Sequence, residues 1–179
     1  MWARRALDAL YWCSAALAAL CLFGIFVIMM AQMGMRQFGI PFPGADDLTA
    51  FLCVGSAFFA LGFTFRRGEL IRVGLGIERF GPRARLVAEG CVLALAGVLV
   101  GYIVWWTAND VLFSYQIEDR AQGSVAFLLW IPKLAMPLGA GVLLIAILDE
   151  FITVLTGRKP AYVVAAEDRA ARGDFSAEV

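Results

Sequence analysis

Histidine is absent from the 179-residue chain. This absence excludes haem ligation by paired histidines, zinc sites built on histidine, and histidine general bases. Charge is also scarce, because 17% of the residues are charged, whereas 61% are hydrophobic, and the formal net charge is zero. The apolar share exceeds that of an ordinary soluble domain, so the composition predicts a membrane protein and gives no indication of a nucleic-acid partner.

The four cysteines lie inside apolar stretches and form no C-x-x-C pair, so we interpret them as small packing residues. They are Cys13, Cys21, Cys53 and Cys91. The sequence also contains no nucleophile–base pair, phosphate-binding loop or metal-ligand cluster that we can recognise. We therefore predict no catalytic residue, no cofactor and no metal site, and expect the protein not to be an enzyme.

Four apolar stretches are long enough to cross a bilayer, and they lie at about residues 7–35, 46–65, 86–113 and 133–155. Short connections join the first to the second and the third to the fourth. The fold prediction is thus an all-α membrane protein, a single domain over residues 1–179 made of two helical hairpins. The stretch after Arg4 and Arg5 is too long for a secretory signal, so we expect an uncleaved first span. Pro137 is expected to kink the start of the fourth span.

A basic connector, residues 66–85, separates the two hairpins and contains six arginines. Arg66 and Arg67 end the second span. Residues 69–80 place apolar and basic side chains on opposite sides of a helix, which predicts a short amphipathic helix in the plane of the membrane surface, ended by Gly81 and Pro82. The candidate membrane-surface anchors are Arg66, Arg67, Arg72 and Arg79.

The distribution of lysine and arginine predicts the orientation. Twelve of the fifteen lie on the side of both termini and the connector, and three lie on the side of the two hairpin loops. Because lysine and arginine accumulate in cytoplasmic loops, we expect both termini to be cytoplasmic. The tail from residue 156 to residue 179 is polar and alanine-rich and is expected to be mobile.

Small residues recur at four-residue spacing in the second and third spans, which lets another helix approach closely. The candidate helix-packing residues are Ser56, Ala60, Gly90, Ala94, Gly97 and Gly101. The spans themselves carry no charged residue near their middle, where a transporter that works alone usually places its substrate and ion sites. A partner protein is therefore expected.

Two local stretches carry a resemblance to a known family. Residues 58–77 read FFALGFTFRRGELIRVGLGI, a small-residue span end followed by arginine, glycine and a basic-apolar segment, and residues 130–139 read WIPKLAMPLG, a proline-flanked start of the last helix. In these stretches and in its four spans the chain resembles the small, DctQ-type membrane subunit of tripartite ATP-independent periplasmic (TRAP) transporters. One departure concerns the glycine that follows the arginines: the family often has His-Ile after it, and this chain has Leu70-Ile71.

The resemblance implies a sodium-coupled uptake system for an organic acid or similar solute, located in a bacterial inner membrane. The implied partners are a large elevator-type membrane subunit, a periplasmic substrate-binding protein and the lipid bilayer. This chain would be a fixed scaffold beside the large subunit. On the implied periplasmic side, the candidate contacts to the binding protein are Asp46, Asp47, Glu118, Asp119 and Arg120, although acids at the start of a helix also stabilise it by capping.

Three other classes were weighed. A small multidrug-type transporter acting as a dimer needs a carboxylate within the first span, and residues 9–35 contain none. A quinone-linked thiol-oxidising enzyme needs cysteine pairs in the outer loops, which are absent. An anchor subunit of another membrane complex remains open.

Overall fold

The computed structural model describes residues 2–67, 82–121 and 126–156. Within them the chain forms helices α1 (Trp2–Gln37), α2 (Ala45–Arg67), α4 (Pro82–Gln116), α5 (Trp130–Lys133) and α6 (Ala135–Leu155). Four helical stretches, counting α5 and α6 together, are long and apolar enough to cross a membrane, which confirms the predicted all-α membrane fold. The expected in-plane helix over 69–80, with Arg72 and Arg79, and the tail beyond residue 156 lie outside the described residues.

The first helix of each hairpin is much longer than the second. Helix α1 has 36 residues and α4 has 35, whereas α2 has 23 and α6 has 21. Both long helices extend beyond the apolar stretches that the sequence marks out. Hydropathy identifies only the part of a helix that lipid can surround, and the hydrogen-bonded backbone continues until a cap ends it.

A one-residue break at Leu134 separates α5 from α6. Pro137 lies three residues later and has no N–H to donate to the carbonyl of Lys133, so the regular ladder is interrupted there. The Leu134 amide keeps its helical bond to the carbonyl of Trp130 at 3.2 Å and shares it with the carbonyl of Ile131 at 3.3 Å. The disturbance that the sequence predicts at the start of the fourth span is thus present as a break of the helix.

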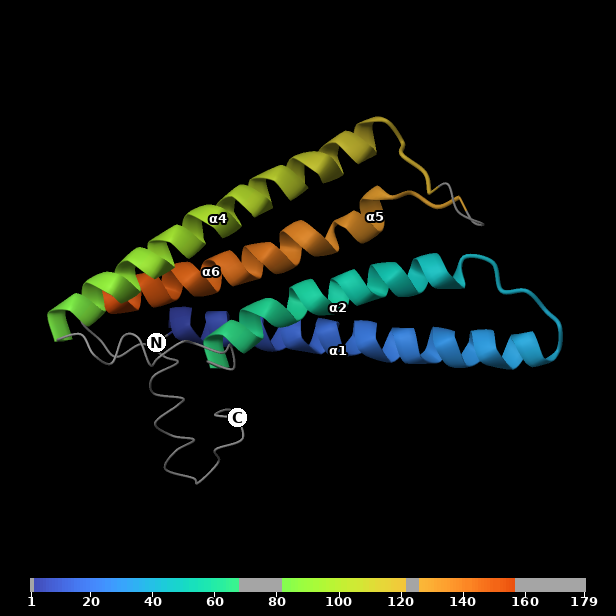
Figure 1. Ribbon diagram of the computed structural model, residues 1–179, viewed down its shortest axis with the longest axis horizontal. Coiled ribbons are helices and arrows are strands. Elements are labelled where there is room, and N and C mark those ends of the chain that lie inside the picture. The colour runs from blue at the N-terminus through green and yellow to red at the C-terminus, as the bar shows by residue number, and fades with distance from the viewer. Residues whose placement is uncertain (1, 68–81, 122–125, 157–179) are drawn as a thin grey trace, which may run out of the picture.

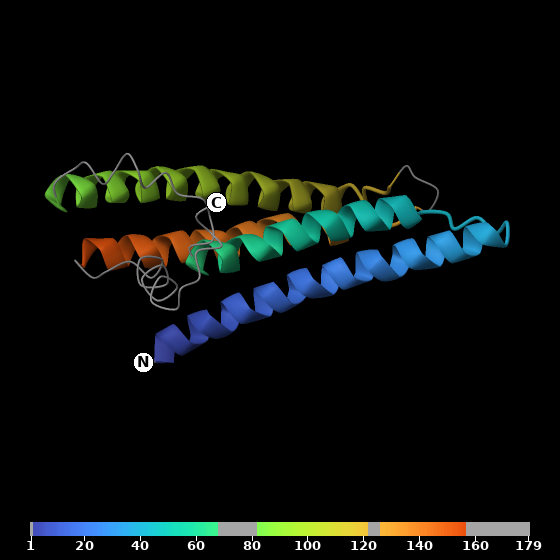
Figure 2. The same cartoon turned by 60° about the horizontal axis from the view of Figure 1, so that its bottom comes forward.

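The helices form a single row in the order α1, α2, α6, α4 (Figures 1 and 2). Helices α2 and α6 are central, and α1 and α4 are the two edges. In the more usual closed four-helix bundle the first and last helices of the ring would also pack against each other. Here each edge helix packs mainly against one neighbour. We call the end that holds residues 38–44 and 117–129 the loop end, and the opposite end the terminal end.

The direction of each helix follows from its contacts. Gln32 of α1 lies beside Asp46 of α2, and Ser14 donates a hydrogen bond to the carbonyl of Phe59, so α1 and α2 are antiparallel. Gly55 and Gly62 of α2 approach Ala135 and Val142 of α6, so the two central helices run in the same direction.

Helices α4 and α6 are antiparallel, because Gly97 lies beside Ile147 while Asp110 lies beside Lys133. The row therefore reads as two hairpins of equal topology, each a long helix followed by a shorter one. The two hairpins point the same way along the row, because α2 and α6 run in the same direction. Parallel repeats of this kind are known in membrane transport proteins.

Glycine allows the two central helices to meet at very short distance. A Cβ atom added to Gly139 would lie 2.6 Å from the carbonyl carbon of Phe58 and 2.7 Å from its Cβ. A Cβ added to Gly62 would lie 2.7 Å from Cγ1 of Val142. The sequence analysis did not single out these glycines. Small residues at a helix interface let backbones pack closely when no hydrophobic force drives helices together in lipid.

The two hairpins are displaced along their length. Helix α2 continues five residues beyond Gly62, while α6 continues thirteen residues beyond Val142, the residue that faces it. At a rise of 1.5 Å per residue, the difference of eight residues corresponds to about 12 Å. The α4–α6 hairpin is thus shifted toward the terminal end, as Figure 1 also shows.

A Schellman motif ends α1 at the loop end. The amide of Gly39 donates to the carbonyl of Arg36, and the amide of Ile40 donates to that of Met35, both at 3.1 Å. Gly39 has φ 68°, the left-handed conformation that this position requires. Met35 and Ile40 are the two apolar residues that usually accompany the motif.

We expect Gly39→Ala to lower the free energy of unfolding by about 1 kcal/mol, because an L side chain in the left-handed region is strained. No atom lies within 4 Å of the added Cβ, so the effect is one of backbone conformation alone. Thermal unfolding in detergent measures it. Gly34→Ala is the matched control, since Gly34 is helical, its Cβ position is also open, and alanine there should stabilise. Equal stabilisation by both substitutions would contradict the prediction.

Candidate functional site

At the loop end of the second hairpin, ion pairs and a side-chain hydrogen bond connect several polar residues. Helix α4 ends there in the same motif that ends α1. The amide of Glu118 donates to the carbonyl of Tyr115 at 3.3 Å, and the amide of Asp119 donates to that of Ser114 at 3.0 Å. Glu118 takes the place of Gly39 and has φ 50°. The apolar pair of the α1 motif is replaced by the polar residues Ser114 and Asp119.

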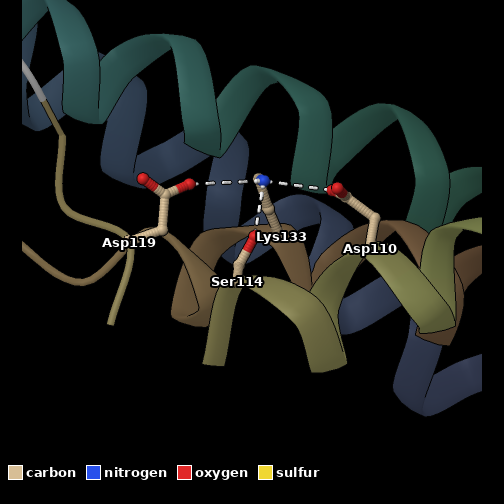
Figure 3. A network of polar contacts seen from close by, with 4 residues as sticks. All are labelled: Asp110, Ser114, Asp119 and Lys133. Carbon is tan, nitrogen blue, oxygen red and sulfur yellow. Dashed lines mark hydrogen bonds and ion pairs between the residues drawn. The ribbon is translucent and has the colours of Figure 1, made fainter. Parts of the chain in front are cut away.

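Lys133 joins these two polar residues (Figure 3). Its Nζ donates a hydrogen bond of 2.7 Å to Oγ of Ser114, which is 1% exposed, and lies 3.8 Å from Oδ2 of Asp119. It also forms an ion pair of 3.1 Å with Oδ2 of Asp110. We call Asp110, Ser114, Asp119 and Lys133 the Lys133 node.

The node also supplies a cation to the C-terminus of α4, whose last turn contains no basic residue. The Lys133 side chain is 27% exposed and turns toward the two carboxylates, with which it forms charge-assisted contacts.

The segment after α4 is fixed by backbone bonds and aromatic rings. The amide of Leu129 donates to the carbonyl of Asp119 and that of Ala121 donates to Phe127, both at 2.9 Å. An isolated antiparallel bridge joins Arg120 and Leu128.

Aromatic rings attach this segment to two helices. Phe127 packs edge-on against Phe51 of α2, with their ring centroids 5.4 Å apart. Tyr115 of α4 packs in the same way against Trp130 of α5, at 5.5 Å. Edge-to-face packing of this kind adds to the burial of the rings. The described part of this connection is therefore held in place by contacts with α2, α4 and α5.

Three of the predicted partner contacts lie together on this structure. Glu118 and Arg120 point outward, with side chains 78% and 63% exposed, and their charged groups are 3.9 Å apart. Asp119, between them in sequence, is half-exposed and faces Lys133. The polar loop that the sequence indicates thus combines two outward charges with one inward charge.

The other two predicted contacts belong to the first hairpin. Asp46 and Asp47 lie in the first turn of α2. Asp46 is exposed and accepts a hydrogen bond of 3.1 Å from Nε2 of Gln32 on α1. Asp47 is half-exposed. Carboxylates at this position stabilise a helix through its dipole, so both roles considered from the sequence are compatible with this placement.

The two predicted membrane-surface anchors that the structure describes lie at the terminal end. Arg66 forms an ion pair of 2.6 Å with Asp8, and its guanidinium lies 4.8 Å from the ring centre of Tyr11. Arg67 lies 4.5 Å from the ring centre of Phe63. Arg66 thus joins the end of α2 to the start of α1, whereas Arg67 packs against a ring of its own helix.

The predicted packing positions have different surroundings. Gly97 faces Ile147 of α6, with 3.7 Å between its built Cβ position and Cγ2 of Ile147, while a Cβ on Gly90 or Gly101 would meet no atom within 4 Å. Ala94 is exposed. On α2, Ser56 and Ala60 are half-buried, and Oγ of Ser56 donates to the carbonyl of Cys53 at 2.8 Å.

The residues that join the hairpins were not among the packing positions predicted from the sequence; they are Gly55, Gly62 and Gly139. The seven-residue spacing of Gly55 and Gly62 is the signal that could have identified their shared face. Within the described ranges, no group of three or more cysteine, aspartate and glutamate side chains is placed to hold a metal ion.

Comparison with known proteins gives the family. The family model for tripartite ATP-independent periplasmic transporters, DctQ component, matches residues 25–157. No curated protein matches the chain closely enough to count as a relative. The match covers about three quarters of the chain, including α2, α4, α5, α6 and the Lys133 node. The chain therefore belongs to the DctQ family, the small membrane components of TRAP transporters.

Proposed function

We propose that this TRAP component is a non-catalytic scaffold that braces a large elevator-type membrane subunit during sodium-coupled uptake of an organic acid. In this proposal the large subunit holds the solute and sodium sites, and a periplasmic protein delivers the solute. Family membership supports the transport role. The arrangement of the helices supports the scaffold role, as follows.

The single-row arrangement is the observation that carries the proposal. A row of helices encloses no space, so it supplies a wall to a transport path but not the path itself. Only 6% of the central apolar stretch of each edge helix is buried within the chain, compared with 33% for α5–α6. Both edges therefore offer long apolar surfaces to lipid or to a neighbouring subunit.

The position of the charges supports the same role. The sequence contains no Asp, Glu, Lys or Arg between residues 9 and 35, 48 and 65, 90 and 109, or 134 and 148. These stretches are the middle parts of the four spans. Ionisable groups at mid-membrane depth mark most substrate and ion pathways, so their absence here favours a subunit whose partner holds the solute.

The proposed orientation places the loop end in the periplasm of a bacterium and both termini in the cytoplasm, because 12 of 15 basic residues belong to the terminal side. The Lys133 node and the exposed residues Glu118 and Arg120 would then face the periplasmic binding protein. The same orientation exposes Asp46 and Asp47 of the first hairpin to that side.

Co-purification tests the scaffold role. We expect the tagged chain, co-expressed with the large membrane subunit of the same transporter, to retain that subunit through detergent extraction and size exclusion. We expect neither protein alone to support uptake in proteoliposomes. A chain that elutes alone would contradict the proposal. Uptake by the chain alone would favour the small self-associating transporter.

A further inference from the structure

Two buried hydrogen-bond donors without an acceptor meet at the terminal end. Tyr11 of α1 is 2% exposed, and its hydroxyl has no hydrogen-bond partner among the described residues. The same is true of Nη1 of Arg66 on α2, which is also buried. The guanidinium lies beside the hydroxyl, 4.8 Å from the centre of the Tyr11 ring, yet no hydrogen bond of ordinary geometry joins the two groups. Buried donors without an acceptor cost free energy, so an acceptor from outside the described chain would stabilise this arrangement.

The two donors lie where the apolar part of the first hairpin ends. Asp8 and Arg66 are the charged residues that border the apolar stretches of α1 and α2 on this side. Trp12 follows Asp8 by one turn and is 63% exposed, which is typical of a residue at the level of the lipid headgroups. The acceptors that a membrane supplies at this depth include the phosphate oxygens of its lipids. A phospholipid phosphate can therefore supply the acceptor that both donors lack.

The charges around the donors indicate what else the ligand carries. The described charged groups that act on the Tyr11 hydroxyl are those of Arg66, Asp8 and Asp149, one positive and two negative. Nη2 of Arg66 forms the 2.6 Å ion pair with Asp8. A phosphate alone would be attracted by the arginine and repelled by both carboxylates. A headgroup that adds an ammonium group to the phosphate offers a partner to charges of both signs.

We propose that Tyr11, Arg66 and Asp8 bind the headgroup of a phospholipid with a primary ammonium group, such as phosphatidylethanolamine. The phosphate accepts hydrogen bonds from the Tyr11 hydroxyl and from Nη1 of Arg66, and the ammonium group donates to Asp8. The side chains of Arg66 and Asp8 are 28% and 52% exposed, so the site is open on the side of these two residues. The guanidinium turns outward on binding and gives the phosphate access to the hydroxyl. The proposal adds a lipid ligand and does not depend on the scaffold role.

Tyr11→Phe tests the proposal, because it keeps the ring beside the Arg66 guanidinium and removes only the hydroxyl. The full chain is purified in detergent, and its unfolding temperature and its lipid binding by native mass spectrometry are measured with and without phosphatidylethanolamine. Without lipid, we expect the variant to unfold at the same temperature as the parent or higher, since a buried hydroxyl without a partner is gone. With lipid, the unfolding temperature of the parent should rise more than that of the variant. The variant should bind the lipid about tenfold more weakly.

Three other ligands test the chemistry of the headgroup. Phosphatidylcholine has a fully methylated ammonium group that cannot donate a hydrogen bond, and phosphatidylglycerol has no ammonium group. Soluble phosphoethanolamine has the same headgroup without acyl chains. We expect the parent to bind phosphatidylethanolamine more tightly than all three. Asp8→Asn should reduce its preference for phosphatidylethanolamine over phosphatidylcholine.

Tyr115→Phe is the matched control, because Tyr115 is a 61% exposed tyrosine at the loop end of α4. It should bind phosphatidylethanolamine as the parent does. Equal affinity of Tyr11→Phe and the parent for this lipid would overturn the proposal. Equal binding of the three lipids by the parent would also overturn it and would indicate lipid that surrounds the helices without a specific site. Equal stabilisation by soluble phosphoethanolamine would overturn the assignment to a lipid.

Discussion

Replacing Gly139 by alanine is expected to lower the free energy of unfolding by about 1–3 kcal/mol and to push the two hairpins apart, because the added methyl group has no room at this helix contact. The added Cβ would lie 2.6–2.7 Å from the carbonyl carbon, carbonyl oxygen and Cβ of Phe58. Because two of these are backbone atoms, α2 and α6 must move apart to accommodate it. Such a shift would also loosen the contact of Gly62 with Val142.

The measurement is thermal unfolding in detergent, together with the yield of a disulfide engineered between α2 and α6. Gly141→Ala is the control, since Gly141 lies on the same helix two residues later and a Cβ there meets no atom within 4 Å. Alanine should stabilise the helix at that position by up to about 1 kcal/mol. Equal behaviour of the two variants would show that close approach of α2 and α6 is unimportant for stability.

Lys133→Met should cost about 1–3 kcal/mol and release the segment that follows α4. The substitution removes the cation between Asp110 and Asp119 and leaves the buried hydroxyl of Ser114 without its donor. The expected loss of stability stays in this range, and below that of a fully buried ion pair, because water screens the two partly exposed carboxylates. Hydrogen exchange should become faster at the amides of Asp119, Ala121 and Leu129, while the amides of α2 keep their protection.

Arg120→Gln provides the comparison for Lys133→Met. Arg120 forms an exposed pair of 3.9 Å with Glu118, so its loss should change stability by less than about 0.5 kcal/mol. If Lys133→Met and Arg120→Gln proved equally mild, the node would be an ordinary surface cluster. A Lys133→Met, Asp119→Asn double variant that recovers part of the loss would support direct coupling of the two residues.

The sequence predicted which segments form spans, because hydropathy and helix length report how each segment meets lipid. It predicted the neighbours within each hairpin, but it did not predict that the second and fourth spans join the two hairpins. Gly97 and Gly101 were selected by their spacing, yet the glycine whose built Cβ lies nearest to another helix is Gly139, which faces Phe58. Spacing identifies small residues on one face, but the partner of that face depends on the arrangement of all four helices.

The sequence predicted which charged residues gather in the loop after α4, but it did not predict their conformation or their contacts. The sequence indicated Glu118, Asp119 and Arg120 as one polar loop, and they do lie together. It gave no sign that Glu118 would be left-handed, because that conformation follows from where α4 stops. Nor could it place Lys133 beside Ser114, since that contact requires the second hairpin to be folded.

The displacement of the two hairpins has a consequence for the surrounding lipid. A bilayer has one hydrocarbon thickness, about 30 Å, and two units shifted by about 12 Å cannot both be centred in it. The row must tilt, or the lipid beside one edge must become thinner. In both cases the apolar borders of α1 and α4 lie at different heights. A subunit bound at one edge would then sit at a different depth from one bound at the other, so hydrophobic mismatch would help to select the edge at which the proposed large subunit binds.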